Sequence, residues 1–142
     1  IYNNADNNTV KNSKLRILNY TGTDASTAYV AFTASATARS AADHGSDNVI
    51  DNNTMSSNST TSTGPYQGIL DYRSSSYKTK CNTFTNNVIR DVYYGHFYMY
   101  YVDGFDIRNN TLTSFRSDAQ SGSGTTYPAY LYYCGGGLTI IQ

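Results

Sequence analysis

Short alternations of apolar and polar residues recur along the chain, each built around an asparagine. The shared order is an apolar residue, a variable one, Asn, two further residues and another apolar residue. Copies occupy residues 8–15, 48–55, 82–89 and 105–112, and a fifth begins at Leu138. Counted from the shared Asn, or from Gln142 in the fifth copy, they lie 40, 34, 23 and 33 residues apart. The alternation predicts strands, and the irregular spacing excludes arrays of fixed-length helical repeats.

A second strand-like segment lies between successive copies, at residues 28–32, 68–72, 97–101 and 129–133. A third short strand is expected just after each shared Asn. Strands of successive copies should then stack in parallel about 4.8 Å apart, with each copy burying its apolar face on the next.

Two columns of apolar residues are predicted to form the core. The column two residues before the shared Asn consists of Val10, Ile50, Phe84, Ile107 and Ile140. The column three residues after it consists of Leu15, Met55, Ile89 and Leu112. The residues between these positions should point outward and form a mostly polar face.

These stretches resemble the repeats of right-handed parallel β-helices, the pectate-lyase-like superfamily that includes phage tailspikes and many secreted surface proteins. The resemblance implies an all-β protein, a right-handed parallel β-helix solenoid of about four to five coils with irregular loop insertions. It further implies an inward asparagine ladder at one corner, in which each Asn hydrogen-bonds to its equivalents. The residues in that position are Asn12, Asn52, Asn86 and Asn109, with Gln142 as a terminal member.

Composition and charge agree with an all-β fold and exclude several kinds of partner. Ten Lys and Arg balance ten acidic residues, all of them Asp, and the chain is rich in Asn, Ser, Thr and Tyr. We expect no nucleic-acid partner because there is no basic stripe, and no membrane span because the longest apolar run is six residues. We expect residues 1–142 to form a single β-helix domain that is an uncapped segment of a longer solenoid, located outside the cell or on its surface.

The pattern of charged residues favours a non-catalytic protein. Asp106 and Arg108 share a strand face, whereas Asp91 and Asp103 lie near turns, where Asp is common. No convincing cluster of catalytic carboxylates emerges. The only two histidines, His44 and His96, are too few for a metal site, and no cofactor is expected.

Tyrosine is the feature that folding alone does not explain. Nine of the fifteen tyrosines lie between Tyr93 and Tyr133, and strand alternation exposes an aromatic column whichever face is buried. Aromatic faces suit stacking on sugar rings or burial in a protein contact, although Tyr also serves as a plain surface residue of strands. The candidate contact residues are Tyr98, Tyr100, Tyr101, Tyr130, Tyr132, Tyr133, Asp106 and Arg108.

We therefore expect a non-catalytic extracellular structural or adhesive β-helix: a surface fibre, adhesin or filament subunit that associates end to end or with another surface protein. The alternative is a carbohydrate-binding or polysaccharide-degrading module that binds a glycan along the tyrosine face. Asn58, in a Ser- and Thr-rich loop, is the candidate for glycosylation. Cys81 and Cys134 are expected to be free, buried thiols, because they lie two copies apart.

Overall fold

The structure is a computed structural model that describes residues 1, 5–33, 45–57, 63–76, 81–119, 125–136 and the backbone of 138–141. Almost all of the regular secondary structure in this part of the chain is strand, with one short 3-10 turn at Ser117–Ala119. The all-β prediction is confirmed. In the same residues, no helix has the length and apolarity needed to cross a membrane.

The strands fall into three series. The first comprises β1 (Thr9–Lys11), β4 (Val49–Asp51), β7 (Thr83–Thr85), β10 (Asp106–Leu112) and β12 (Leu138–Ile141). The second comprises β2 (Lys14–Arg16), β5 (Thr54–Ser56) and β8 (Val88–Ile89), and it also ends on β10, which is long enough to serve both. The third comprises β3 (Ala28–Phe32), β6 (Gln67–Tyr72), β9 (Gly95–Tyr100) and β11 (Tyr127–Tyr132).

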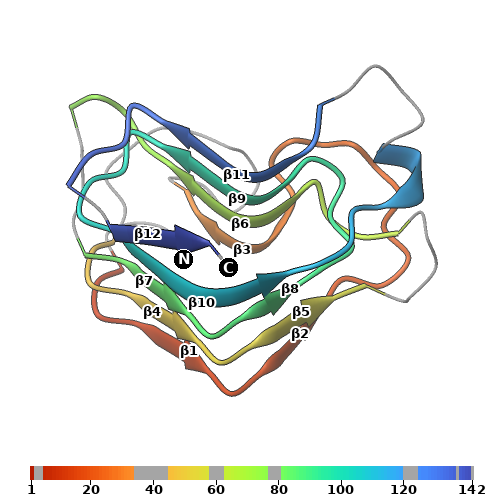
Figure 1. Ribbon diagram of the computed structural model, residues 1–142, viewed down its shortest axis with the longest axis horizontal. Coiled ribbons are helices and arrows are strands. Elements are labelled where there is room, and N and C mark those ends of the chain that lie inside the picture. Colours follow the sequence, from red (N-terminus) through yellow and green to blue (C-terminus); the bar gives the residue numbers. More distant parts are fainter. Residues whose placement is uncertain are drawn as a thin grey trace.

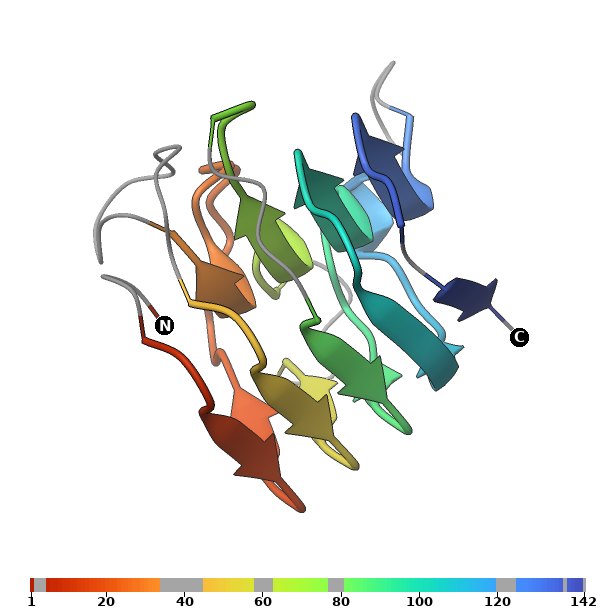
Figure 2. The same ribbon diagram turned by 90° about the vertical axis from the view of Figure 1, so that its left-hand side faces the viewer.

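Every pairing between these strands is parallel, and each strand pairs with its equivalent in the next copy of the repeat. The first two series form one sheet that bends where β10 passes from one to the other, and the third forms a separate four-stranded sheet. Figure 1 shows the four-stranded sheet across from the bent one. Figure 2 shows the strands of the first series side by side in sequence order.

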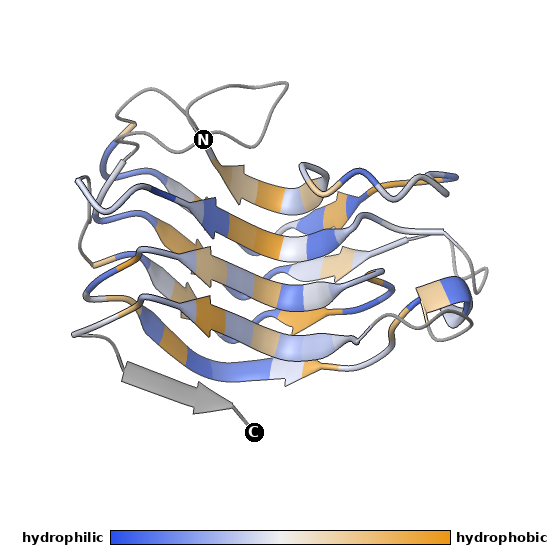
Figure 3. Cartoon of the chain, turned by 90° about the horizontal axis from the view of Figure 1, so that it is seen from above, coloured by the Kyte–Doolittle hydropathy of each residue, from blue (hydrophilic) through white to orange (hydrophobic). Residues whose placement is uncertain are grey.

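The core lies between the sheets and contains the two predicted columns. Ile50, Phe84 and Ile107 are buried and lie in register, as do Met55 and Ile89 in the second column. At the first copy, Val10 and Leu15 are half-buried, and so is Leu112 at the end of β10. The third series completes the core with Val30, Phe32, Ile69, Phe97 and Met99. Figure 3 shows apolar and polar positions following one another along the strands.

The predicted place of Ile140 in the first column is wrong. Thr139 pairs with Ile107, and Leu138 pairs with Asp106, so β12 is shifted by one residue. The register also changes between Ile107 and Asn110, where β10 contains an irregularity. Asn109, which lies within this irregularity, has a left-handed backbone conformation.

The predicted inward ladder is also wrong by one residue. Asn12, Asn52, Asn86 and Asn109 are all exposed, with φ between 53° and 57°. They make the corner between the first and second series, which Asn does more readily than most residues. Their side chains bond on the outside: the Asn52 amide donates to Asn12 Oδ1, and the Asn86 amide donates to Asp51 Oδ1, both at 2.7 Å.

The inner ladder is formed by the next residue of each copy, which we call the inner asparagine ladder: Ser13, Asn53, Asn87 and Asn110. Asn53 donates from its backbone and side-chain nitrogens to Asn87 Oδ1, at 3.0 and 3.1 Å. Asn87 donates in the same way to Asn110 Oδ1, at 2.9 and 3.0 Å. The left-handed corner interrupts strand alternation, so two outward residues precede the inward one.

A second ladder of this kind lies before the first series of strands. Asn8 and Asn48 each donate two hydrogen bonds to the Oδ1 of the next copy's asparagine, and Asn82 ends the row. The Asn82 amide donates to Asp71 Oδ2 at 3.1 Å, and Asp71 forms a fully buried ion pair with Arg73 at 2.8 Å. Polar groups inside the fold are therefore tied into networks that hold successive copies in register.

Candidate functional site

Eleven tyrosines form one continuous cluster over the four-stranded sheet and its flanking turns. We call this group the tyrosine face; it consists of Tyr66, Tyr72, Tyr93, Tyr94, Tyr98, Tyr100, Tyr101, Tyr127, Tyr130, Tyr132 and Tyr133. All six tyrosines proposed from the sequence belong to it. Strand alternation explains the exposure, because Phe97 and Met99 point into the core.

Within the tyrosine face the rings stack in columns across the strands. Tyr72, Tyr100 and Tyr132 form one column, with ring centroids 4.7 and 5.1 Å apart and planes within 12°. Tyr98 and Tyr130 form a second, at 4.9 Å. Because equivalent positions of paired strands are about 4.8 Å apart, the strand spacing itself sets this stacking.

The stacking changes what the tyrosine face can offer a partner. Tyr100 has a stacked ring on both sides, so it presents its edge and hydroxyl group to the surroundings rather than its ring face. A sugar ring that stacks on aromatic residues needs a ring face. The middle ring of this column, Tyr100, therefore contributes a hydroxyl group to the surface and no open stacking platform.

The pKa is raised at some of the hydroxyl groups of the tyrosine face. A hydrogen bond with Tyr133 raises the pKa of Tyr132 to about 12. Burial raises the pKa of Tyr94, with smaller contributions from neighbouring tyrosines. Tyr94 and Tyr132 therefore keep their protons at neutral pH, and their hydroxyl groups can both donate and accept hydrogen bonds.

Asp106 and Arg108 do not join the tyrosine face. They lie on β10, in the other sheet, where the Arg108 guanidinium makes two hydrogen bonds of 2.6 Å to the Asp106 carboxylate. The pairing raises the pKa of Arg108 above its usual value. Each charge is matched by its neighbour on the same strand, so the structure separates these two residues from the six tyrosines.

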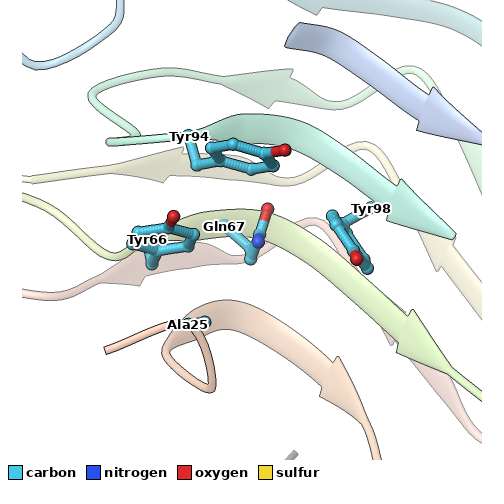
Figure 4. Close-up of a pocket in the computed structure, with 5 residues that line it drawn as sticks. All are labelled: Ala25, Tyr66, Gln67, Tyr94 and Tyr98. Carbon is cyan, nitrogen blue, oxygen red and sulfur yellow. The ribbon is translucent and has the colours of Figure 1, made fainter. Parts of the chain in front are cut away.

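A cavity of about 230 Å³ opens at one end of the tyrosine face, and sequence reasoning did not find it. Its lining residues are Ala25, Tyr66, Gln67, Tyr94 and Tyr98. Figure 4 shows the Gln67 amide between the rings of Tyr66 and Tyr98, with Tyr94 beside it. None of the lining residues carries a charge.

The walls of this cavity are held by backbone hydrogen bonds between adjacent copies. The backbone N–H of Gln67 donates to Thr27 O at 2.9 Å, and the backbone N–H of Tyr94 donates to Tyr66 O at 2.8 Å. Tyr66 and Tyr94 stack at 5.2 Å, whereas Tyr98 lies 6.2 Å from Tyr94 with its plane tilted by 48°. The cavity therefore has two aromatic walls that are not parallel.

Gln67 is the unusual residue of this cavity. Its side chain is fully buried, and within the described part of the chain neither Oε1 nor Nε2 has a hydrogen-bond partner. Gly95 lies opposite on β9, and a Cβ there would come within 3.3 Å of Gln67 Oε1. Because Gly95 has no side chain, there is room for the side-chain amide of Gln67. A sequence signal was present in Tyr66-Gln67-Gly68 and Tyr94-Gly95-His96, which occupy equivalent positions in successive copies.

The remaining acidic residues occupy separate structural positions. The Asp91 carboxylate accepts hydrogen bonds from the Ser57 backbone and the Ser114 hydroxyl, while Asp103 pairs with Gly135 in an isolated bridge. Neither lines the cavity. Across the described residues, no group of three or more His, Cys or Asp side chains is placed to hold a metal ion.

His96 is buried against Phe115, with ring centroids 4.6 Å apart. Burial lowers its pKa to about 4, and the nearby Ser114 backbone and Asp91 act in the opposite direction. The imidazole is therefore neutral under ordinary conditions. His44 and the glycosylation candidate Asn58 lie outside the described residues.

Both cysteines are free thiols, but their burial differs from the prediction. Cys81 is exposed and has a left-handed backbone conformation at a corner, with φ of 67°. Cys134 is half-buried, and burial raises the pKa of its thiol. Cys81 is exposed because its corner turns the side chain away from the core.

Comparisons with known proteins identify no relative. No family model matches the chain, and neither the curated proteins nor the solved structures include a significant match.

Proposed function

We propose that this chain is a non-catalytic extracellular structural or adhesive module of a surface fibre, adhesin or filament, built as a right-handed parallel β-helix similar to those of the pectate-lyase-like superfamily. Its tyrosine face would be the contact surface for a second copy or for another surface protein. The observation that carries the proposal is the continuous cluster of eleven tyrosines described above.

Three features support the β-helix. All pairings are parallel, each strand series runs in sequence order, and successive copies are linked by asparagine ladders. Connections between parallel strands of one sheet are right-handed in about 98% of known cases. The left-handed corner residues recur at equivalent positions, as in Asn7, Asp47 and Cys81.

The chemistry of the tyrosine face supports a contact role. Interfaces are enriched in Tyr, which supplies a large apolar surface together with a hydroxyl group at little entropic cost. Tyr132 and Tyr133 are 37% and 58% exposed, which is high for large aromatic side chains. The neutral, Asn-, Ser-, Thr- and Tyr-rich composition further supports an extracellular or cell-surface location.

The proposal is tested by assembly and adhesion. Negative-stain electron microscopy of the purified chain over a concentration series should show uniform filaments or ordered oligomers. If another surface protein is the partner, cells or particles should instead retain the chain. The double variant Tyr132→Ser, Tyr133→Ser should lose whichever behaviour the wild type shows.

A matched control separates the tyrosine face from general stickiness. Leu18 is 51% exposed and lies outside the tyrosine face, so Leu18→Ser removes an exposed apolar side chain elsewhere and should leave assembly or adhesion intact. A wild-type chain that stays monodisperse and adheres to nothing contradicts the proposal. So does an equal effect of the tyrosine and leucine changes.

The alternative is a carbohydrate-binding or polysaccharide-degrading module. The cavity floored by Gln67 is the observation that favours sugar binding. For degradation, two carboxyl groups would have to converge within about 10 Å beside the substrate, whereas the residues lining the cavity are uncharged.

A further inference from the structure

We propose that the cavity above Gln67 binds one neutral pyranose ring of a glycan. The inference goes beyond the proposed contact role of the tyrosine face, because it names a ligand for the cavity at one end of that face. Four properties of the cavity lead to this ligand: the unpaired amide, the absence of charge, the shape of the walls and the size.

The unpaired amide indicates a polar ligand. A buried primary amide without partners is costly, and buried polar groups in native proteins are nearly always hydrogen-bonded. Figure 4 shows the Gln67 amide directed between the tyrosine rings, and neither of its polar atoms pairs with a described protein group. An amide presents a donor and an acceptor side by side, which matches two adjacent hydroxyl groups of a sugar.

The lack of charge indicates a neutral ligand. The five lining residues are Ala, Gln and Tyr, so no cation would pair with a uronic acid or a phosphate. Tyr94 keeps its proton, because burial raises its pKa, and its hydroxyl can therefore donate to a sugar oxygen. This distinguishes the site from one built for acidic polysaccharides.

The shape of the walls favours a sugar over a flat heterocyclic base. A planar base is held best between two parallel rings, whereas the Tyr94 and Tyr98 planes are tilted by 48°. A pyranose ring can place its C–H groups against one tyrosine and its hydroxyl groups toward the other and toward Gln67. On β6, the residue paired with Tyr98 is Leu70, so no third aromatic ring extends the column of Tyr98 and Tyr130 on that side.

The size indicates a single ring. The cavity of about 230 Å³ is smaller than the roughly 300–1,000 Å³ of typical small-molecule sites. A longer glycan would have to extend over the tyrosine face. Binding of one isolated ring should accordingly be weak, and avidity from several modules would strengthen it.

The test uses methyl glycosides of glucose, galactose and mannose as probes, with galacturonic acid and adenosine as comparators. Binding is followed by saturation-transfer NMR and by tyrosine fluorescence, which is easy to read because the chain contains no tryptophan. At least one neutral glycoside should bind saturably and more tightly than either comparator. Failure of all three, or tighter binding of galacturonic acid or adenosine, overturns the inference.

The near-isosteric variant Gln67→Met tests the amide itself. It should weaken glycoside binding at least tenfold, because both hydrogen bonds from the amide to the sugar are lost. Leu18→Ser, outside the tyrosine face and the cavity, is the control and should bind the glycoside like the wild type. Undiminished binding by Gln67→Met overturns the inference.

Thermal unfolding separates loss of the site from loss of the fold. Replacing an unpaired buried amide by an apolar side chain of similar shape should leave the melting temperature unchanged or raise it. A fall of several degrees would mean that the amide is a structural group, and the inference would then fail. Because assembly is tested through Tyr132 and Tyr133, failure of the proposed function and failure of this inference give different results.

Discussion

Replacing Asn87 by alanine tests how the copies of the repeat are held together. Asn87 is fully buried in the inner asparagine ladder, between Asn53 and Asn110. Its Oδ1 accepts hydrogen bonds from the backbone and side-chain nitrogens of Asn53. Its Nδ2 donates to Ile50 O at 2.8 Å and to Asn110 Oδ1 at 3.0 Å. Alanine removes all four bonds.

The expected loss follows from these four bonds. At about 1 kcal/mol for each net hydrogen bond, Asn87→Ala should lower the free energy of unfolding by about 4 kcal/mol. Leaving the Asn53 backbone N–H buried without its Asn87 partner can add about 1–3 kcal/mol. Since whole domains are stable by roughly 5–15 kcal/mol, the variant should be close to unfolding.

The adjacent residue provides the matched control. Asn86 is exposed, has φ of 57° and makes one side-chain hydrogen bond, to Asp51. Glycine adopts that backbone conformation without strain, so Asn86→Gly should cost less than about 1 kcal/mol. The loss in the free energy of unfolding should therefore be at least fourfold larger for Asn87→Ala than for Asn86→Gly, although the two asparagines are neighbours in one copy.

Urea unfolding followed by circular dichroism measures both variants. The midpoint for Asn87→Ala should fall far below that of the wild type, while the midpoint for Asn86→Gly should change little. Equal midpoints for the two variants would refute the assignment of the ladder to the second asparagine. A larger loss for Asn86→Gly would restore the inward ladder that the sequence suggested.

Two further predictions concern pH. Hydrogen bonds from Lys11, Thr85 and Asn86 lower the pKa of Asp51 to about 2, so its contribution to stability is complete above pH 4 and disappears as the pH falls toward 2. At pH 7 the free energy of unfolding of the wild type should exceed that of Asp51→Asn by about 1 kcal/mol, a modest value because the site is near the surface. Acid titration of both proteins should show this difference vanishing. A difference that persists at pH 2 would contradict the assignment. Burial lowers the pKa of His96 to about 4, so the folded state binds fewer protons than the unfolded state between pH 6.5 and 4 and loses stability on acidification. The loss in the free energy of unfolding should be on the order of 3 kcal/mol, and it should be absent when the stability of His96→Phe is measured against pH. Parallel stability profiles for the two proteins would show that His96 does not titrate as described.

The repeat could be predicted from the sequence because apolar residues that face the core recur at constant positions within each copy. Ile50 and Phe84 are aligned by the shared asparagine, and the structure pairs them in register. The irregular intervals between copies did not hide the pattern, since insertions lie outside the strands. Local alternation and a corner residue were sufficient for this part of the fold.

The direction of the ladder could not be predicted by alternation alone. A left-handed residue such as Asn52 reverses the side on which the next side chain lies, so the inward position moves to Asn53. The Asn-Asn doublets at 52–53, 86–87 and 109–110 contained this information. The first asparagine of each doublet suits the turn, and the second has the amide that a buried ladder requires.

The composition of the tyrosine face was predictable, but its geometry was not. Alternation placed Tyr98 and Tyr100 on one side of β9, and the pairing with Tyr130 and Tyr132 follows from the register. Whether a tyrosine exposes its ring face or its edge depends on the side-chain conformations of its neighbours on the two adjacent strands. The sequence of a single strand does not determine these conformations. Gln67 left even less signal, because its burial depends on Gly95 in the next copy.

The contrast between the paired polar groups of the interior and the unpaired amide of Gln67 supports a functional role for the cavity. The buried asparagines of both ladders have their amides paired, and Asp71 and Arg73 neutralise each other. His96 tolerates burial by remaining neutral against Phe115. Gln67 has no charge to lose, and its buried amide, without a described partner, keeps the cost of burial. Among the described residues that line the cavity, Gln67 is the one with a buried amide that lacks a partner, and local rules tend to be broken at sites that serve a function.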